Sequence, residues 1–366
     1  LEDVDRLSDF AARWEIPSIA VIDPMLLGTG GLKPPTDFGS SGVDFIAGEA
    51  QHLAIPPSFG GPGLGLFGCR HNDKSKKDLR NTPGRYIGRA KDSHGRDCFV
   101  MVLSTREQHI RKEKATSNVC SNQAFLATIA GANLLAKGEN GLRHSLAQAL
   151  KSRNQVSEWI RQREGIELAY PQTPAFNDLL ISVSDDYNSL LEDARLHGLH
   201  LGVEVSNRLN GDNRKLYKIT FSDIHDEAAL TVLKDFIFEQ FPASSNIQDE
   251  IASPAHLLRD GSANLPSFSH DELLNYYEQL ANLNVSPDDG CYPLGSCTMK
   301  YNPMLNDWAA GLDGFSRVHP QSPEADAQGP LEVLYEIQEW FKAITGLAGV
   351  TTQPVAGAQG ELVKSH

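Results

Sequence analysis

Short apolar strand patterns alternate with amphipathic helix patterns along most of this chain, and this alternation restricts the fold more than any other feature. The opening LEDVDRLSDFAARW has helical periodicity, and the run PSIAVIDP that follows is apolar and ends at Pro24. Such a run is typical of a buried strand in a parallel sheet. Further strand patterns occur at 43–48 and at the end of 58–68, after Gly- and Pro-rich stretches. Interleaved helices and strands favour an α/β fold over a bundle or a sandwich.

The second part of the chain contains a different mixture of elements. Residues 104–138 have long helical patterning, for which Gly138 is the predicted stop. Residues 139–241 alternate amphipathic helices with the short strands FNDLLISV and LYKITF, which predicts a small α+β domain. After a polar linker, two more helices are predicted, HDELLNYYEQLANLN and PLEVLYEIQEWFKAITG. The closing VTTQPVAGAQGE predicts a short strand, a Gly-rich turn and the first turn of a helix.

Length and charge exclude several classes of protein. The 366 residues predict two or three structural units. With 33 Lys and Arg against 47 Asp and Glu, the net charge of −14 argues against a protein that coats nucleic acid. No run approaches the ~18 apolar residues that a membrane span needs. The chain starts at Leu1 without signal-peptide character, so we expect it to be cut from a longer protein.

The cysteines do not form a recognisable framework. There are five, scattered along the chain: Cys69, Cys98, Cys120, Cys291 and Cys297. An odd number in a long chain indicates a reducing compartment, not a disulfide scaffold. Cys291 and Cys297 are too far apart for a CxxC clip, so no metal site is predicted. Redox control through either thiol stays an open hypothesis.

Three segments combine residue types that could carry chemistry. Asp23 follows a predicted strand, where it could face a ligand at the sheet edge or serve as a turn carboxylate before Pro24. The Gly-rich turn 357–361 could hold a phosphate at a helix N-terminus, or be a plain strand–helix turn. The irregular loop 292–302 contains hydroxyls, a thiol and an amine, which indicates either a site or a structural cap.

The segment 70–91 is strongly basic within an acidic chain. It contains eight Lys or Arg and two Asp, a local charge of +6. A solvated loop face is one interpretation, and contact with an anion or a partner is the other.

Six segments, in the same order, make the chain similar to the glycine cleavage system P-protein, a glycine decarboxylase that uses pyridoxal phosphate (PLP). The strings GSCTMK and REQHIR are long and irregular, so chance agreement is negligible. The segments are DPMLLGTGGLKPP, GEAQHLAIPPSFGGPGLG, STREQHIRKEKATSNVCSNQA, YPLGSCTMKYNP, HP with its trailing AQG, and QPVAGAQGE.

The resemblance implies a type I PLP-dependent transferase fold, like that of aspartate aminotransferase. P-proteins have two similar halves, of which only the second carries the PLP lysine. Residues 1–103 would be the carboxyl-terminal part of the large α/β domain of the first, non-catalytic half. Residues 104–245 would form its long helix and small α+β domain. Residues 246–366 would be the linker, arm and amino-terminal part of the second half, so the chain resembles the middle of a fused P-protein.

The resemblance also assigns candidate site residues. In the first half it places Asp23 where an Asp supports the pyridinium nitrogen and Gln51 where a Lys forms the Schiff base. An amide cannot condense with an aldehyde, and the neighbouring His52 is no substitute, so this half would be degenerate. In the second half, the lysine would lie beyond His366. The implied phosphate-binding residues are Gly357, Ala358, Gln359 and Gly360, and the implied catalytic residues are Ser296, Cys297 and Thr298.

The family reaction is PLP-dependent decarboxylation of glycine, with aminomethyl transfer to the lipoyl group of the H-protein. This chain alone is expected to be inactive. The alternative is a non-catalytic scaffold or regulatory subunit that completes the active site of another chain. Implied partners are glycine, the H-protein, and a second P-protein chain or the missing carboxyl-terminal portion, but no nucleic acid or membrane. We expect an oligomer in the cytoplasm, or in the mitochondrial matrix of a eukaryote. An acidic partner could contact segment 70–91, or the basic residues Arg106, His109 and Arg111. The alternative is that these residues lie on an ordinary solvated helix surface.

Overall fold

The structure is a computed structural model that forms two compact units. It describes residues 2–73, 75–82, 86–102, 112–114, 121–184, 187–209, 211–252, 255–285, 290, 302–354 and 359–360. Unit 1 consists of 1–18, 23–43 and 134–269, and unit 2 consists of 19–22, 44–133 and 270–366. Each unit is described by itself.

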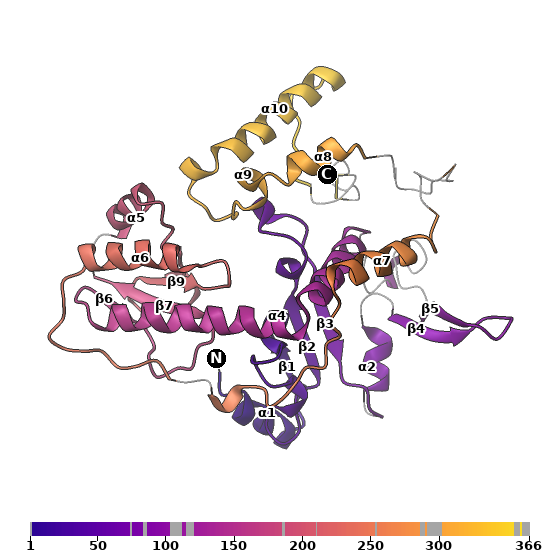
Figure 1. The fold of residues 1–366 in the computed structure, drawn as a ribbon, viewed down its shortest axis with the longest axis horizontal. Coiled ribbons are helices and arrows are strands. Elements are labelled where there is room, and N and C mark those ends of the chain that lie inside the picture. The colour runs from indigo at the N-terminus through magenta and orange to yellow at the C-terminus, as the bar shows by residue number, and fades with distance from the viewer. Residues whose placement is uncertain are drawn as a thin grey trace. The chain divides into compact units, whose positions relative to one another are not determined.

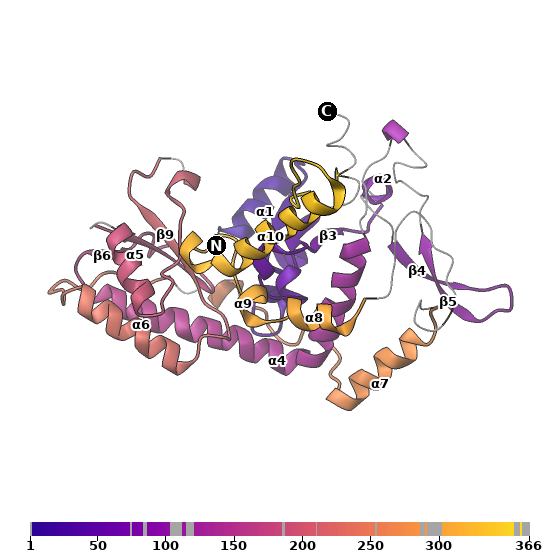
Figure 2. The ribbon, with the colours of Figure 1, turned by 90° about the horizontal axis from the view of Figure 1, so that it is seen from above.

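Unit 1 contains an antiparallel sheet with helices on one side of it. The strand order is β6-β7-β9-β8, and every neighbouring pair is antiparallel. Figure 2 shows α4 and α6 to one side of these strands. The helices and strands are α1 (Val4–Arg13), the second part of α4 (Ser121–Arg161), β6 (Ile166–Leu168), β7 (Asp178–Val183), α5 (Tyr187–Leu196), β8 (Val203–Glu204), β9 (Leu216–Thr220) and α6 (Glu227–Gln240). The short 3-10 helices are η1 (Pro24–Leu27), η2 (Pro35–Asp37), η6 (Ser206–Arg208) and η7 (Ala255–Leu257).

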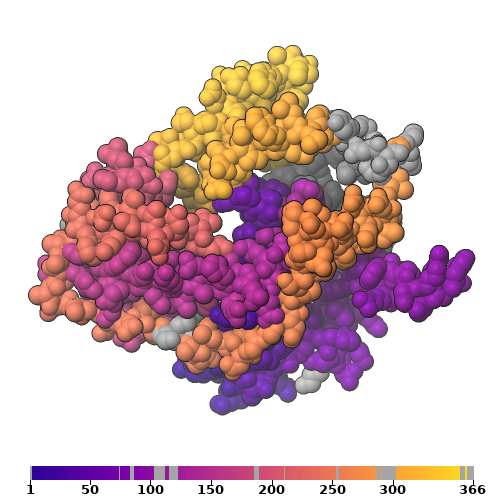
Figure 3. Space-filling view, in the orientation of Figure 1, coloured from indigo at the N-terminus to yellow at the C-terminus, as the bar shows by residue number. Residues whose placement is uncertain are grey.

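The main core of unit 1 lies between this sheet and three helices. The alternating pattern of β7 places Leu179, Ile181 and Val183 on the inner face and Asp178, Leu180 and Ser182 on the other face. α4, α5 and α6 supply the other side of the core, and the space-filling view shows α6 packed along α4 (Figure 3). The predicted α+β architecture of 139–241 is therefore present. The buried helix residues are Val156, Ile160, Ala194, Leu230, Phe236 and Ile237.

A smaller core holds the first residues of the chain in unit 1. Asp3 caps α1 by accepting a hydrogen bond from Arg6 N at 3.1 Å. Asp5 of the same helix pairs with Lys33 at 2.8 Å. Beneath these contacts, Leu32 packs with Leu146, Phe176 and Leu257. The predicted helix at 1–14 is confirmed.

Unit 2 contains a three-stranded sheet with both strand directions. β1 and β2 are parallel, and β2 and β3 are antiparallel. The strand predictions for these segments are confirmed, but the prediction that the first strand is buried is wrong. Ile19 is 62% exposed and Val21 is 81% exposed, because no described element covers their face of this narrow sheet. The strands are β1 (Ile19–Val21), β2 (Phe45–Glu49) and β3 (Gly65–Cys69).

The basic segment 70–91 forms regular structure, so its interpretation as a loop face is wrong. It contains α2 (Lys76–Asn81) and β4 (Tyr86–Lys91), which pairs with β5 (Asp97–Val102) in a hairpin. Figure 1 labels this hairpin. Lys76 forms an ion pair with Asp73 and Lys91 forms one with Asp97, each at 2.7 Å. Nearby carboxylates therefore neutralise part of the positive charge of this segment.

The helical run starting near residue 104 is described from Ser121 onward, apart from the 3-10 turn η5 (Lys112–Lys114). At Gly138 the backbone leaves the helical conformation, with φ 57° and ψ −171°, so α4 consists of two helical segments that meet at a kink. The predicted stop at Gly138 corresponds to this kink, and the helix predicted after it continues to Arg161.

The remaining named elements of unit 2 are helices and short 3-10 turns. Both predicted helices are present, but the predicted strand near the end is wrong, since 349–354 have no strand structure. In the part of the chain that the structure describes, no helix has the length and hydropathy to cross a membrane. The elements are the short turns η3 (Gln51–Leu53), η4 (Ser58–Gly60) and η8 (Glu324–Asp326), and the helices α7 (His270–Ala281), α8 (Met304–Ala310), α9 (Asp313–Ser316) and α10 (Gln328–Thr345).

Candidate functional site

The segment after β2 contains Gln51, the residue predicted to replace a Schiff-base lysine. Its side chain is half-buried, and the amide Nε2 donates a hydrogen bond to the Gly60 carbonyl at 3.0 Å. Its backbone N–H donates to Glu49 Oε1 at 2.8 Å, and the same oxygen accepts from Leu64 N at 2.8 Å. Glu49 and Gln51 therefore join the start of this segment to its far end.

The loop that Gln51 contacts has an unusual backbone. Four consecutive residues have positive φ: Ser58 (47°), Phe59 (50°), Gly60 (103°) and Gly61 (41°). Side-chain-bearing residues rarely adopt such angles. Phe59 N donates to Val318 O at 2.7 Å, which adds a third attachment point. A Cβ on Gly61 would lie 2.9 Å from Gln51 Nε2 and the backbone φ there is positive, so a side chain at 61 would be strained and would push against the amide.

These contacts decide whether the first-half residues fit PLP. A covalent PLP site needs a primary amine, which reacts with the aldehyde. The side chain at 51 is an amide that is hydrogen-bonded to its own loop, and the carboxylate of Glu49 beside it would repel a phosphate. His52 is exposed in η3 and carries no primary amine. The residues around Gln51 therefore do not fit the cofactor.

Asp23 lies where β1 ends and η1 begins. It is the N-cap of η1, and its Oδ1 accepts a hydrogen bond from Met25 N at 2.8 Å. This is the ordinary role of an Asp at a helix start. The structure thus gives Asp23 a local structural task, and its cofactor role stays a prediction.

The GTGG part of the loop after Asp23 is held from within unit 1. Thr29 Oγ1 donates to Glu139 Oε1 at 2.6 Å, and Ala263 N donates to the same carboxylate oxygen at 3.1 Å. Hydrogen bonds from Ser262 and Thr29 lower the pKa of Glu139. Gly31 passes so close to the Leu26 carbonyl that any Cβ would overlap it. The motif therefore shapes a tight turn against α4 in this structure.

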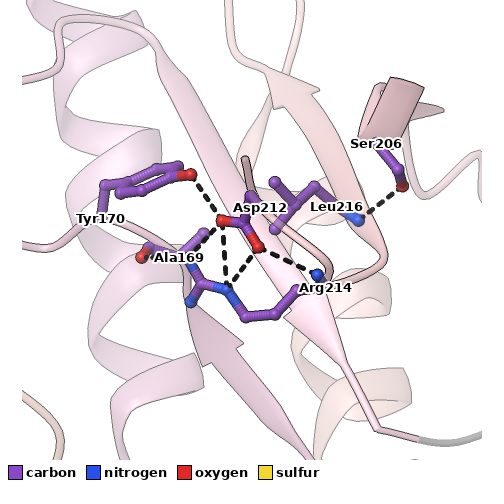
Figure 4. Close-up of polar contacts among 6 residues, drawn as sticks. All are labelled: Ala169, Tyr170, Ser206, Asp212, Arg214 and Leu216. Carbon is purple, nitrogen blue, oxygen red and sulfur yellow. Dashed lines mark hydrogen bonds and ion pairs between the residues drawn. The ribbon is translucent and has the colours of Figure 1, made fainter. Parts of the chain in front are cut away.

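A polar cluster that sequence reasoning missed lies at one end of the unit 1 sheet (Figure 4). Tyr170 donates its hydroxyl to Asp212 Oδ2 at 2.5 Å, and Arg214 donates to the same carboxylate at 2.8 Å. Arg214 also donates to Ala169 O at 3.1 Å and lies 5.2 Å from the Tyr170 ring centroid.

The electrostatics of this cluster follow from its hydrogen bonds. The Arg214 guanidinium, and then the Tyr170 hydroxyl, hold the pKa of Asp212 well below its usual range. In turn, the hydrogen bond to Asp212 raises the pKa of Tyr170. The Asp212 carboxylate thus accepts from both the Tyr170 hydroxyl and the Arg214 guanidinium, which is typical of a structural network. Only the Asp-x-Arg spacing could have indicated it in the sequence.

Several predicted site residues lie outside the described residues. These are Ser296, Cys297, Thr298, Gly357 and Ala358, together with Arg106, His109 and Arg111. Gln359 and Gly360 lie in a helical turn and are exposed. Among the described cysteines, Cys69 and Cys98 form no disulfide, and burial raises the pKa of the Cys69 thiol. No group of His, Cys, Asp or Glu suited to a metal ion occurs in the described part.

Comparison with known proteins identifies the relatives of the chain. A family profile described as the glycine cleavage system P-protein matches residues 1–210. The Pseudomonas fluorescens protein named glycine dehydrogenase (decarboxylating) 2 is 33% identical over 340 residues, which are 90% of this chain and 34% of the relative. The Deinococcus radiodurans glycine dehydrogenase (decarboxylating) is 33% identical over 338 residues, 90% of this chain and 33% of the relative. The chain thus spans about a third of the length of these curated relatives.

One solved structure supports the same relationship. It is the inhibitor-bound crystal structure of a glycine decarboxylase (P-protein) of the glycine cleavage system, with 29% identity and a TM-score of 0.56. The match covers 65% of this chain and 52% of that one. The predicted fold class is confirmed.

Proposed function

This chain belongs to the glycine cleavage system P-protein family, and from that premise we propose that it supplies the central portion of a glycine decarboxylase. The whole enzyme would use PLP to decarboxylate glycine and pass the aminomethyl group to the lipoyl arm of an H-protein. Within it, the segment around Gln51 would be the site of the non-catalytic half. The chain itself would lack the Schiff-base lysine and would be inactive alone.

The observation that carries the proposal is the state of Gln51. On this proposal its amide stands at the family position of the lysine, and its hydrogen bond to Gly60 O gives it a structural task. Glu49 fixes both ends of the same segment through two backbone N–H groups. A site that holds its own loop closed in this way supports packing within the enzyme in place of covalent cofactor binding. PLP would bind through the turn 357–360, near Ser296, Cys297 and Thr298, with Asp23 left to cap η1.

The same observation supports a second function. A chain with a degenerate site could act as a non-catalytic scaffold or regulatory subunit that completes the active site of another P-protein chain. The two proposals differ in what the chain needs from its partner. The enzyme-portion proposal requires the flanking portions of a P-protein, and the scaffold proposal requires a complete P-protein chain.

Complementation distinguishes the two functions. The chain is purified alone, with the flanking portions of a P-protein relative, and with a complete relative, and glycine–bicarbonate exchange is measured with H-protein present. The enzyme-portion proposal predicts no exchange for the chain alone and exchange once the flanking portions are added. Stimulation of a complete relative, without activity from the flanking portions, would favour the scaffold. A stable assembly with the flanking portions that binds PLP but exchanges no bicarbonate would contradict the first proposal.

A further inference from the structure

A pocket of about 340 Å³ lies along the second part of α4, entirely within unit 1. Arg153, Asn154, Ser157, Glu158 and Arg161 line it, and their spacing of three and four residues places them on one helix face. Glu250 lies on the opposing segment. This volume is at the small end of the range for small-molecule pockets.

Arg153 is a buried cation that lacks a partner of opposite charge. It is only 3% exposed, and its Nε and Nη2 donate to the neutral carbonyls of Phe176 and Ala175 at 3.0 and 2.9 Å. No described carboxylate lies within ion-pair distance of it. Its Nη1 makes no hydrogen bond to a described residue and is not sealed from solvent. Buried arginines are usually paired, because an uncompensated charge in the interior is costly.

Burial has the expected effect on this group. Desolvation lowers the pKa of the Arg153 guanidinium, although arginine remains charged near neutral pH. An anion bound at Nη1 would remove much of this desolvation penalty. The pocket therefore has an electrostatic reason to attract a negatively charged group to one end.

Among the other charged side chains of the pocket, one carboxylate has no partner of opposite charge in the described residues. Arg161 and Glu158 form an ion pair, and Arg161 Nε also donates to Gln248 O at 2.9 Å, so these two charges neutralise each other. Glu250 is exposed and forms no hydrogen bond or ion pair through its side chain with any described residue. Two unmatched charges of opposite sign thus remain in the pocket, Arg153 and Glu250.

The segment that holds Glu250 is fixed on both sides. Gln248 N donates to Arg161 O at 3.1 Å, and Ala252 N donates to Pro171 O at 2.7 Å. Gln248 is also held through its side chain, which donates to Ile166 O at 2.7 Å. Because the wall is already ordered, a ligand would bind without the entropy cost of ordering it.

We propose that this pocket binds a free amino acid, with its carboxylate on Arg153 and its amino group on Glu250. A guanidinium is suited to a carboxylate by charge and by its planar donors. Asn154 and Ser157 also line the pocket and offer neutral hydrogen-bonding groups. The unmatched carboxylate of Glu250 disfavours a second anionic group, so the pocket selects a zwitterion over a dicarboxylate.

Calorimetric titration of the 366-residue chain tests this site. The probes are L-serine, L-glutamine and L-leucine, with L-leucinamide, which lacks the carboxylate, and succinate, which lacks the amine. At least one of the three amino acids is expected to bind, and leucinamide and succinate are expected to bind at least tenfold more weakly than that amino acid. Absence of binding by all three amino acids at millimolar concentration would overturn the proposal.

Two pocket variants and one control locate the binding. Arg153→Gln and Glu250→Gln are each expected to weaken amino-acid binding at least tenfold. Lys151→Gln removes a charge from the same helix outside the pocket, at a side chain that is 51% exposed, and should change binding less than twofold. If Arg153→Gln fails to fold, Glu250→Gln still decides, because Glu250 is exposed and supports no contact. Unchanged binding in Glu250→Gln would show that the amino acid binds elsewhere.

Discussion

Replacing Glu49 by Ala is predicted to loosen the segment between β2 and β3 while the rest of the chain stays folded. The Glu49 carboxylate accepts two backbone hydrogen bonds at 2.8 Å, from Gln51 N and Leu64 N. A buried hydrogen bond to a charged acceptor contributes ~1.5–3 kcal/mol. Glu49 is exposed, so each of its two hydrogen bonds is worth less than that. Discounting for solvent gives ~0.5–1 kcal/mol each, so local stability should fall by about 1–2 kcal/mol.

This loss of local stability can be measured as faster backbone amide hydrogen exchange. A change of 1–2 kcal/mol raises the population of the open state about 5–30-fold. Exchange at the amides of Gln51 and Leu64, followed by mass spectrometry of peptides covering 49–64, should accelerate by this factor in Glu49→Ala. Glu49→Gln keeps a neutral acceptor and should show about half the free-energy change.

The control is Glu332→Ala, which removes the same charge from an exposed position on α10. It should leave exchange in 49–64 unchanged. Equal exchange in Glu49→Ala and in this control would refute the argument that Glu49 holds the segment closed.

Three further changes test the fold around the candidate sites. Because the pKa of Asp212 is lowered in the folded state, its ionised carboxylate stabilises the fold above the ordinary aspartate value of 3.8, and this contribution is lost as pH falls below that value. Asp212→Asn should therefore make the acid limb of a pH–stability curve less steep. An unchanged limb would contradict the hydrogen-bond assignment. Leu179→Ala in the unit 1 core should cost about 2–5 kcal/mol in urea unfolding, and Leu196→Ala, at an 85% exposed position, should cost less than about 0.5. Gly31→Ala should lower the melting temperature because its Cβ would overlap Leu26 O, whereas Gly349→Ala meets nothing within 4 Å; equal effects would sink the close-approach argument.

Much of the fold could be predicted because periodic apolar residues record which face of an element is buried. β7 reads Leu179, Ile181, Val183 at every second position, and all three enter the core. The same reasoning failed for β1, because an apolar run shows that a strand forms but not whether another layer covers it. Ile19 and Val21 are exposed in a sheet of three strands.

The β4–β5 hairpin was missed for a related reason. Its large apolar side chains are exposed, with Ile87 at 65% and Phe99 at 74%, so no buried face marks it. The turn did carry a signal. Asp92 accepts hydrogen bonds from His94 N at 2.8 Å and Arg96 N at 2.9 Å, as expected for an Asp that starts a turn ending at Gly95.

At the candidate sites, too, some features could be predicted from the sequence and others could not. The amide at Gln51 could be predicted from the sequence, because it depends only on which residue occupies that position and on its chemistry. Its hydrogen bond to Gly60 O depends on a run of positive φ angles, which sequence patterns do not specify. Tyr170 and Asp212 lie 42 residues apart and meet only because of the strand order of the sheet.

We propose that this chain has an amide, and no reactive lysine, at the degenerate site of a P-protein. The most direct test is reduction of the purified chain with borohydride in the presence of PLP, followed by peptide mapping. The account predicts no stoichiometric phosphopyridoxyl adduct on any single lysine and an unmodified peptide around Gln51. Stoichiometric modification of one lysine, prevented by an excess of glycine, would contradict it.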